Sequence, residues 1–152
     1  MTTDKLLRLV CDAFADLQMP KGETIASSAE LEPQAIQTLL FGRPWTTVDA
    51  ALLLSYGQDA DTGAMPFFLS PEAFRYYLPA FLTFIVSHYS DAGTLIDALL
   101  LKLKQASDEL APCTYSQRQR LTILSFLEYL KASHSEDAIM GREIDRALAV
   151  WA

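Results

Sequence analysis

The chain has 152 residues, of which 51% are hydrophobic and 20% are charged, values typical of a packed globular protein and not of a disordered chain. Its net charge of −7 at pH 7 repels nucleic-acid phosphates and anionic membrane surfaces, so we expect neither as a partner. Asp12 and Asp16 interrupt the apolar run near the N-terminus and no stretch has the length of a membrane span, so the sequence favours a cytoplasmic protein.

Apolar residues recur at helical spacing along the whole chain, beginning with a helix predicted over residues 4–17 and ended by Pro20 and Gly22. Residues 23–32 follow as a loop or a short helix. The pattern of the next helix begins at Pro33 and ends at Gly42, because proline suits a first helical turn and glycine suits the position after the last.

Thr46 and Asp49 have the spacing of a capping box, which predicts a short third helix that closes at Gly57. Residues 57–66, with the sequence GQDADTGAMP, form the clearest predicted loop.

The sequence Ser-Pro-Glu at residues 70–72 predicts the start of a long helix, because it supplies a capping hydroxyl, a first-turn proline and an acid at the positive helix end. Large apolar residues keep helical phase from Phe74 to Tyr89 and past Pro79. An interior proline costs about 3 kcal/mol, whereas burial recovers about 1.5–3 kcal/mol for each large apolar side chain. We therefore predict a helix that bends at Pro79 and lies in the middle of a bundle.

Residues 90–105 continue as a fifth helix, and Ser116 with Gln119 forms a capping box for a helix that ends near His134. Ser135 is the predicted cap of the last helix. The sequence thus predicts an all-α fold, with residues 1–152 in a single domain of six or seven helices around the Pro-bent helix.

Metal and nucleophile chemistry find little support in the residue pattern. Residues 59–63, Asp-Ala-Asp-Thr-Gly, resemble the opening of a calcium loop, but Gly63 stands where a third ligand is needed. His88 and His134 have no metal-ligand spacing, and His88 is expected to be a hydrogen-bonded core imidazole. We predict no metal, no cofactor and no catalytic residue.

Cys11 and Cys113 lie far apart and form no CxxC motif. They are expected to be reduced and packed as small hydrophobic side chains, which is typical of a cytosolic protein.

Arg75, Tyr76 and Tyr77 form the one unusual cluster, just before Pro79. They could line a pocket for a small anion or for a side chain of a partner. The alternative is that their polar tips satisfy backbone carbonyls that Pro79 leaves without a donor.

The acidic residues are unevenly distributed, with ten acidic and four basic side chains in residues 1–74, a balance of −6, and nine and eight in residues 75–152, a balance of −1. Such an acidic half would attract a basic protein. We predict partner-binding residues at Glu30, Glu32, Asp59 and Asp61; the alternative is that these acids only keep the protein in solution.

Several sequence blocks resemble a bacterial family of short proteins catalogued only as a domain of unknown function. The resemblance covers roughly residues 40–152 and rests on Trp45, residues 69–72, residues 75–79, Gln119 with residues 126–130, and Trp151. It implies a helical single domain from a bacterial cytoplasm and no particular activity.

These features together predict a protein-interaction role without catalysis, most concretely an acidic immunity protein that neutralises a basic toxin or effector. A small-molecule or anion-binding protein, or a weak enzyme, built on Arg75, Tyr76 and Tyr77 is the alternative. A mimic of duplex DNA would need regularly spaced surface acids, which the sequence lacks.

Overall fold

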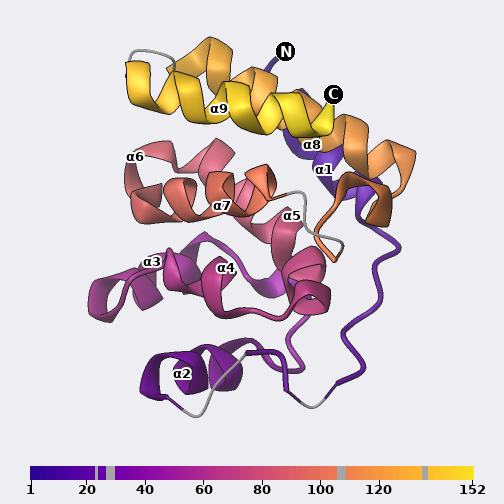
Figure 1. Cartoon of the computed structure of the whole chain (residues 1–152). Helices are drawn as coiled ribbons and strands as arrows, with labels where there is room; N and C mark the ends of the chain where they lie inside the picture. The colour runs from indigo at the N-terminus through magenta and orange to yellow at the C-terminus, as the bar shows by residue number, and fades with distance from the viewer. Residues whose placement is uncertain (23, 27–29, 106–108, 135–136) are drawn as a thin grey trace. The chain divides into compact units, whose positions relative to one another are not determined.

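The computed structural model describes residues 1–22, 24–26, 30–105, 109–134 and 137–152, and the regular elements in these ranges are all helical, which confirms the all-α prediction. The helices are α1 (Thr3–Ala13), α2 (Leu31–Leu40), α3 (Ala50–Asp59), α4 (Ala64–Phe68), α5 (Pro71–Ser87), α6 (Tyr89–Ala92), α7 (Thr94–Lys104), α8 (Gln117–His134) and α9 (Ala138–Trp151), with short 3-10 turns η1 (Trp45–Thr47) and η2 (Pro112–Thr114) (Figure 1).

Contacts within the chain divide it into two compact units. One, here called the terminal unit, comprises residues 1–15 and 100–152, and the other, the middle unit, comprises residues 16–99. The last turns of α7 belong to the terminal unit and its first turns to the middle unit. The prediction of a single domain around a central bent helix stays a prediction.

The terminal unit consists of α1, α8, α9 and the end of α7, and α8 and α9 lie side by side (Figure 1). The capping box of α8 is present as predicted, because Gln119 N donates to Ser116 Oγ at 3.1 Å and Ser116 N donates to the Gln119 side chain at 3.0 Å. Trp151 is buried in this unit, and its indole N–H donates a hydrogen bond to the Leu103 carbonyl at 2.8 Å, which connects the end of α9 to α7.

The middle unit contains α2 to α6 and the start of α7, and its longest helix is α5. Ser70 caps this helix by accepting a hydrogen bond from Ala73 N at 3.2 Å, and Pro71 occupies the first turn, both as predicted. The helix continues through Pro79, and twelve of its 17 residues are buried. Burial of the apolar side chains thus offsets the hydrogen bond that the proline removes.

Three predicted boundaries in the middle unit are wrong. Asp49 is itself the cap of α3, accepting from Leu52 N at 3.0 Å, so that helix begins four residues after Thr46 and runs past Gly57. The predicted loop of residues 57–66 contains the start of α4. Gly93 has a φ of 45°, a left-handed conformation that divides the predicted fifth helix into α6 and α7.

The terminal unit also differs from the sequence prediction. The first helix ends at Ala13 and not near Leu17. Ser135 lies outside the described residues, and the cap of α9 is Asp137, which accepts from Ile139 N at 2.8 Å. Cys11 and Cys113 are exposed, so the prediction that they pack as small hydrophobic side chains is wrong; Cys11 falls outside the buried stripe of Leu6 and Val10 on α1.

None of the helices in the described residues has the length and apolarity required to span a lipid bilayer.

Candidate functional site

The two tyrosines of the Arg75 cluster are buried in the middle unit, and their hydroxyls meet backbone groups. The Tyr77 hydroxyl donates to the carbonyl oxygens of Leu40 and Arg43, the latter at 2.8 Å. The Tyr76 hydroxyl accepts a hydrogen bond from Trp45 N at 3.3 Å. These partners belong to residues 40–45, at the end of α2 and the start of η1, and are not the carbonyls near Pro79. The two tyrosines therefore connect α5 to the segment between α2 and η1.

Burial, with Tyr76 as a smaller contribution, raises the pKa of Tyr77 from 10.0 to about 12. Its phenol therefore stays neutral at physiological pH and serves as a hydrogen-bond donor. Arg75 is half-buried on the same helix. A ligand at Arg75, Tyr76 and Tyr77 would have to displace the backbone partners of both phenols; that pocket stays a prediction.

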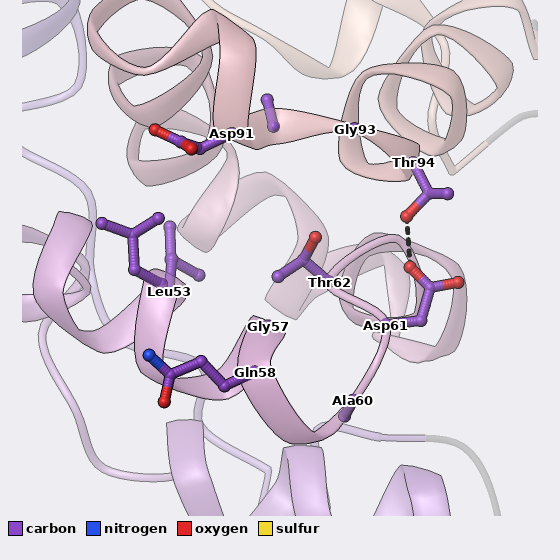
Figure 2. Close-up of a pocket in the computed structure, with 11 residues that line it drawn as sticks. Leu53, Gly57, Gln58, Ala60, Asp61, Thr62, Asp91, Gly93 and Thr94 are labelled. Atoms are coloured by element: carbon purple, nitrogen blue, oxygen red, sulfur yellow. Dashed lines mark hydrogen bonds between the residues drawn. The ribbon is translucent and has the colours of Figure 1, made fainter.

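A hollow of about 520 Å³ lies among α3, the turn at residues 60–63 and the junction of α6 with α7. We call it the Asp91 hollow. Figure 2 shows Asp91 and Asp61 on opposite sides of it, with Thr62 between them and with Leu53 and Gln58 below Asp91. Its lining offers two carboxylates, two hydroxyls and one amide above an apolar base, a set suited to binding positive or hydroxyl-bearing groups.

Two hydrogen bonds fix the side chain of Asp61 at the edge of this hollow. Its Oδ1 accepts from Gly63 N at 2.9 Å and from the Thr94 hydroxyl. Gly63 must be small here, because a Cβ would come within 2.9 Å of the Thr94 carbonyl oxygen. The other oxygen, Oδ2, points away from Gln58 and Thr62 in Figure 2, and no hydrogen bond within the described residues uses it.

Asp61 also lines a second hollow of about 290 Å³, which we call the Phe67 hollow. Its other lining residues include Glu32 of α2 and Phe67 and Phe68 of α4. Phe67 is 57% exposed, and the rings of Phe67 and Phe68 meet edge to face at 5.0 Å. The lining of this hollow thus combines exposed apolar area with two carboxylates, and exposed apolar area is a common feature of protein-binding surfaces.

The field of these carboxylates is evident at Tyr56 on α3. Burial first, and then the charges of Glu32 and Asp61, raise the pKa of Tyr56 above its ordinary value. The buried hydroxyl oxygen has no hydrogen-bond partner among the described residues. Glu32 and Asp61 are therefore both close enough to act on one side chain.

The four predicted partner-binding acids thus fall into different positions. Glu32 and Asp61 come together at the Phe67 hollow, whereas Glu30 precedes α2 and Asp59 ends α3. Asp91 and Phe67 were not predicted. The sequence does not indicate which phenylalanine of an apolar run will be exposed. Asp91 lines the Asp91 hollow because the chain turns at Gly93, two residues later.

His88 ends α5 and stacks on Phe84, with the ring centres 5.4 Å apart. Its Nδ1 has no hydrogen-bond partner among the described residues, which contradicts the predicted hydrogen-bonded imidazole. Within the described ranges, no three histidine, cysteine or acidic side chains are grouped so as to hold a metal ion.

The charge of the protein is divided between its two units. The middle unit has ten acidic and three basic residues, a balance of −7, whereas the terminal unit has nine of each, a balance of zero. Among its described residues, the terminal unit contains the ion pairs Lys104–Glu143, Arg118–Asp12, Lys131–Asp145 and Arg146–Glu143. Neither Glu32 nor Asp61 forms an ion pair with a described residue.

Comparison with known proteins gives a family but no activity. No curated protein and no solved structure matches the chain. A family model matches residues 2–152, which includes the first forty residues that the sequence resemblance left out. The chain therefore belongs to the family of unknown function DUF6714.

Proposed function

We propose that the protein is a non-catalytic binding protein whose acidic middle unit docks onto a basic protein. The most concrete form of this role is an immunity-type protein that neutralises a basic toxin or effector. One observation carries the proposal: the full balance of −7 falls in residues 16–99, where Glu32 and Asp61 line a hollow beside the exposed Phe67.

Charge complementarity explains why a basic partner suits this surface. Surface carboxylates speed the encounter with a positively charged protein and disfavour an acidic one. Exposed apolar side chains beside the carboxylates, namely Phe67 at 57% and Leu54 at 38% exposure, would then be buried by the partner and supply affinity.

The proposal also assigns α5 a structural role. Its buried apolar side chains and its engaged phenols support a bent helix around which the bundle assembles as a single domain. We further propose a bacterial cytoplasmic setting, a Ser-Pro-Glu to Leu-Pro signature at residues 70–79, and no cofactor.

Capture of partners from the native cell, followed by binding measurements on the purified pair, tests this function. We expect a basic partner whose affinity falls steeply between about 50 and about 300 mM salt. The double variant Glu32→Lys/Asp59→Lys should lower that affinity at least about tenfold at low salt. Both residues are exposed, and neither accepts a hydrogen bond from another described residue.

The matched control is Asp4→Lys/Glu128→Lys, which makes the same change in net charge at exposed positions of the terminal unit. It should retain most of the affinity. Equal losses in the two double variants, or no loss in either, would contradict docking through the middle unit. If the partner is a toxin, co-expression with the native chain should restore growth and co-expression with Glu32→Lys/Asp59→Lys should not.

A further inference from the structure

The Asp91 hollow has room for a long side chain and part of the peptide that carries it. Its volume of about 520 Å³ lies within the roughly 300–1,000 Å³ of pockets that enclose a ligand. Small residues make this space, because Gly57 and Ala60 line it from the end of α3 and the turn that follows, and Ala92 and Gly93 line it from the junction of α6 with α7. All of these residues belong to the middle unit.

The negative charge of the hollow has no counterpart within its lining. Lys21, Arg43 and Arg75 are the basic residues of the middle unit, and none of them lines the Asp91 hollow. Asp91 is exposed, and its carboxylate forms no ion pair or hydrogen bond within the described residues. A cationic group is therefore the complementary occupant.

Apolar surface accompanies the carboxylate in this hollow. Leu54 lines the hollow and is 38% exposed, and Figure 2 shows its neighbour Leu53 below Asp91. A cation on a flexible aliphatic stem can cover such an apolar side chain while its charged end stays at a carboxylate and in contact with water. The occupant that fits both features is a long basic side chain.

The other lining residues distinguish between the two long basic side chains. The hollow offers acceptors of three kinds on separate segments, namely the carboxylate of Asp91 on α6, the amide of Gln58 on α3 and the hydroxyl of Thr62 in the turn. The three N–H groups of an ammonium diverge from one nitrogen and suit acceptors on different sides. A guanidinium favours an aromatic face or a bidentate carboxylate, and none of the eleven described residues that line the hollow is aromatic.

We infer that the Asp91 hollow receives a lysine side chain of the basic partner, with its ammonium group at Asp91 and its aliphatic stem along Leu54. This inference rests on the proposed function for the origin of the lysine. The hollow itself is a property of residues in α3, α6 and the turn at residues 60–63.

Nuclear magnetic resonance titration of the full chain with short peptides tests the inference. The peptides are acetyl-Gly-Lys-Gly-amide, its arginine counterpart and its acetyl-lysine counterpart, which keeps the stem without the charge. Gly57 and Gly93 line the hollow and report on it through their amide signals, whereas Gly22 of the middle unit and Gly141 of the terminal unit do not line it. We expect saturable shifts at Gly57 and Gly93 with the lysine peptide, weaker binding of the arginine peptide and no saturation with the acetyl-lysine peptide.

Three results of the titration would overturn the inference. Equal responses to the lysine and acetyl-lysine peptides would show that charge plays no part. Shifts at Gly22 and Gly141 as large as those at Gly57 and Gly93 would show that the cation gathers over the whole surface and not in the hollow. Tighter binding of the free diamine putrescine than of the lysine peptide would make a small diamine the occupant.

Single variants identify the groups that hold the peptide. Asp91→Asn should weaken the lysine peptide by about two- to fivefold, and Leu54→Ala should weaken it by about twofold, because the stem loses apolar contact. Asp97→Asn is the matched control, since Asp97 is an exposed acid of the middle unit that does not line the hollow; its affinity should match that of the native chain. Unchanged affinity in both Asp91→Asn and Leu54→Ala would exclude the hollow.

The two proposals fail in different ways. If a basic protein partner binds through the middle unit while the lysine peptide leaves Gly57 and Gly93 unshifted, the lysine site is wrong and the binding function stands. If the peptide binds in the hollow but the chain captures no basic protein that depends on Glu32 and Asp59, the hollow is a lysine site and the proposed function is wrong.

Discussion

Tyr77 shows how a single hydroxyl can connect distant segments of the middle unit. It lies on α5, yet it donates to carbonyls of Leu40 and Arg43, more than thirty residues away. Leu40 is the last residue of α2 and Arg43 follows it, so both carbonyls lie at a helix end, where helical partners are missing. Removal of the hydroxyl would take its donor from the part-buried Arg43 carbonyl and would leave the Leu40 carbonyl only the hydrogen bond from Arg43 N at 2.9 Å.

The substitution Tyr77→Phe should therefore lower the free energy of unfolding by about 1–3 kcal/mol, because the carbonyls of Leu40 and Arg43 lose the hydroxyl that donates to them while the ring is retained. Urea unfolding followed by circular dichroism measures the change. The control is Tyr56→Phe, which removes a hydroxyl that has no partner among the described residues and should change stability by less than about 0.5 kcal/mol. Similar losses in the two variants would show that the hydrogen bonds of Tyr77 contribute little.

The same residue predicts how stability responds to alkali. The pKa of Tyr77 is about 12 in the folded chain and 10.0 as the ordinary value, so the folded state retains a proton that the unfolded state releases. This contribution to stability is complete below pH 10, decreases above it and is lost as the pH rises through about 12.

Unfolding free energies measured at intervals over that range should fall more steeply for the native chain than for Tyr77→Phe. Identical slopes would mean that Tyr77 ionises as readily in the folded chain as in the unfolded one.

At this scale the sequence predicts the kind of contact but not the partner. The pattern around Pro79 suggested that Tyr76 and Tyr77 bond to backbone groups, which is correct, but placed those groups next to the proline. The actual acceptors and donor belong to residues 40–45. Only the tertiary packing of α5 against η1 and the end of α2 brings them near, and no local spacing encodes it.

Helix starts were predictable where the capping group is local. Ser70 and Ser116 cap α5 and α8 as expected, because a hydroxyl and a backbone N–H three residues later suffice. The short helix α4 was missed because it begins directly after Gly63, where contact with Thr94 leaves no room for a side chain. Contacts of that kind depend on residues thirty positions apart.

Two glycines provide a matched test of this packing. Gly63→Ala should lower the free energy of unfolding by about 1–3 kcal/mol, since its Cβ would press on a backbone oxygen that cannot move alone. Gly141→Ala should raise it by about 0.5–1 kcal/mol, because Gly141 lies inside α9 with nothing within 4 Å of the added Cβ. Thermal unfolding of both variants measures these changes in stability. A Gly63→Ala protein as stable as the native chain would show that α4 can shift away from α7.

For the whole molecule, the sequence predicts the net charge but not its location in space. Division of the chain at residue 74 gave balances of −6 and −1, whereas the units of the structure have −7 and zero. The difference arises because residues 75–99, which hold Arg75, Asp91 and Asp97, belong to the middle unit, whereas the residues 1–15 that leave it carry two acidic and two basic side chains.

Concentrated charge should make stability depend on salt. Like charges in the middle unit repel one another, and added salt screens this repulsion. We expect the melting temperature to rise by a few degrees between about 10 and about 200 mM sodium chloride, and the rise to be smaller in Glu32→Lys/Asp59→Lys. Differential scanning calorimetry measures both.

The double variant Asp4→Lys/Glu128→Lys again serves as the control, because its changes lie in the neutral unit. It should keep most of the salt response of the native chain. A melting temperature independent of salt in all three proteins would show that the acids of the middle unit do not repel one another appreciably.

Asp61 is one carboxylate shared by two adjoining hollows. A cation that neutralises it from the side of Phe67 lowers the attraction for a second cation on the side of Asp91, and thermodynamic reciprocity requires an equal penalty in the opposite order. Two cations would therefore bind the two hollows with negative cooperativity, because both would depend on the single negative charge of Asp61.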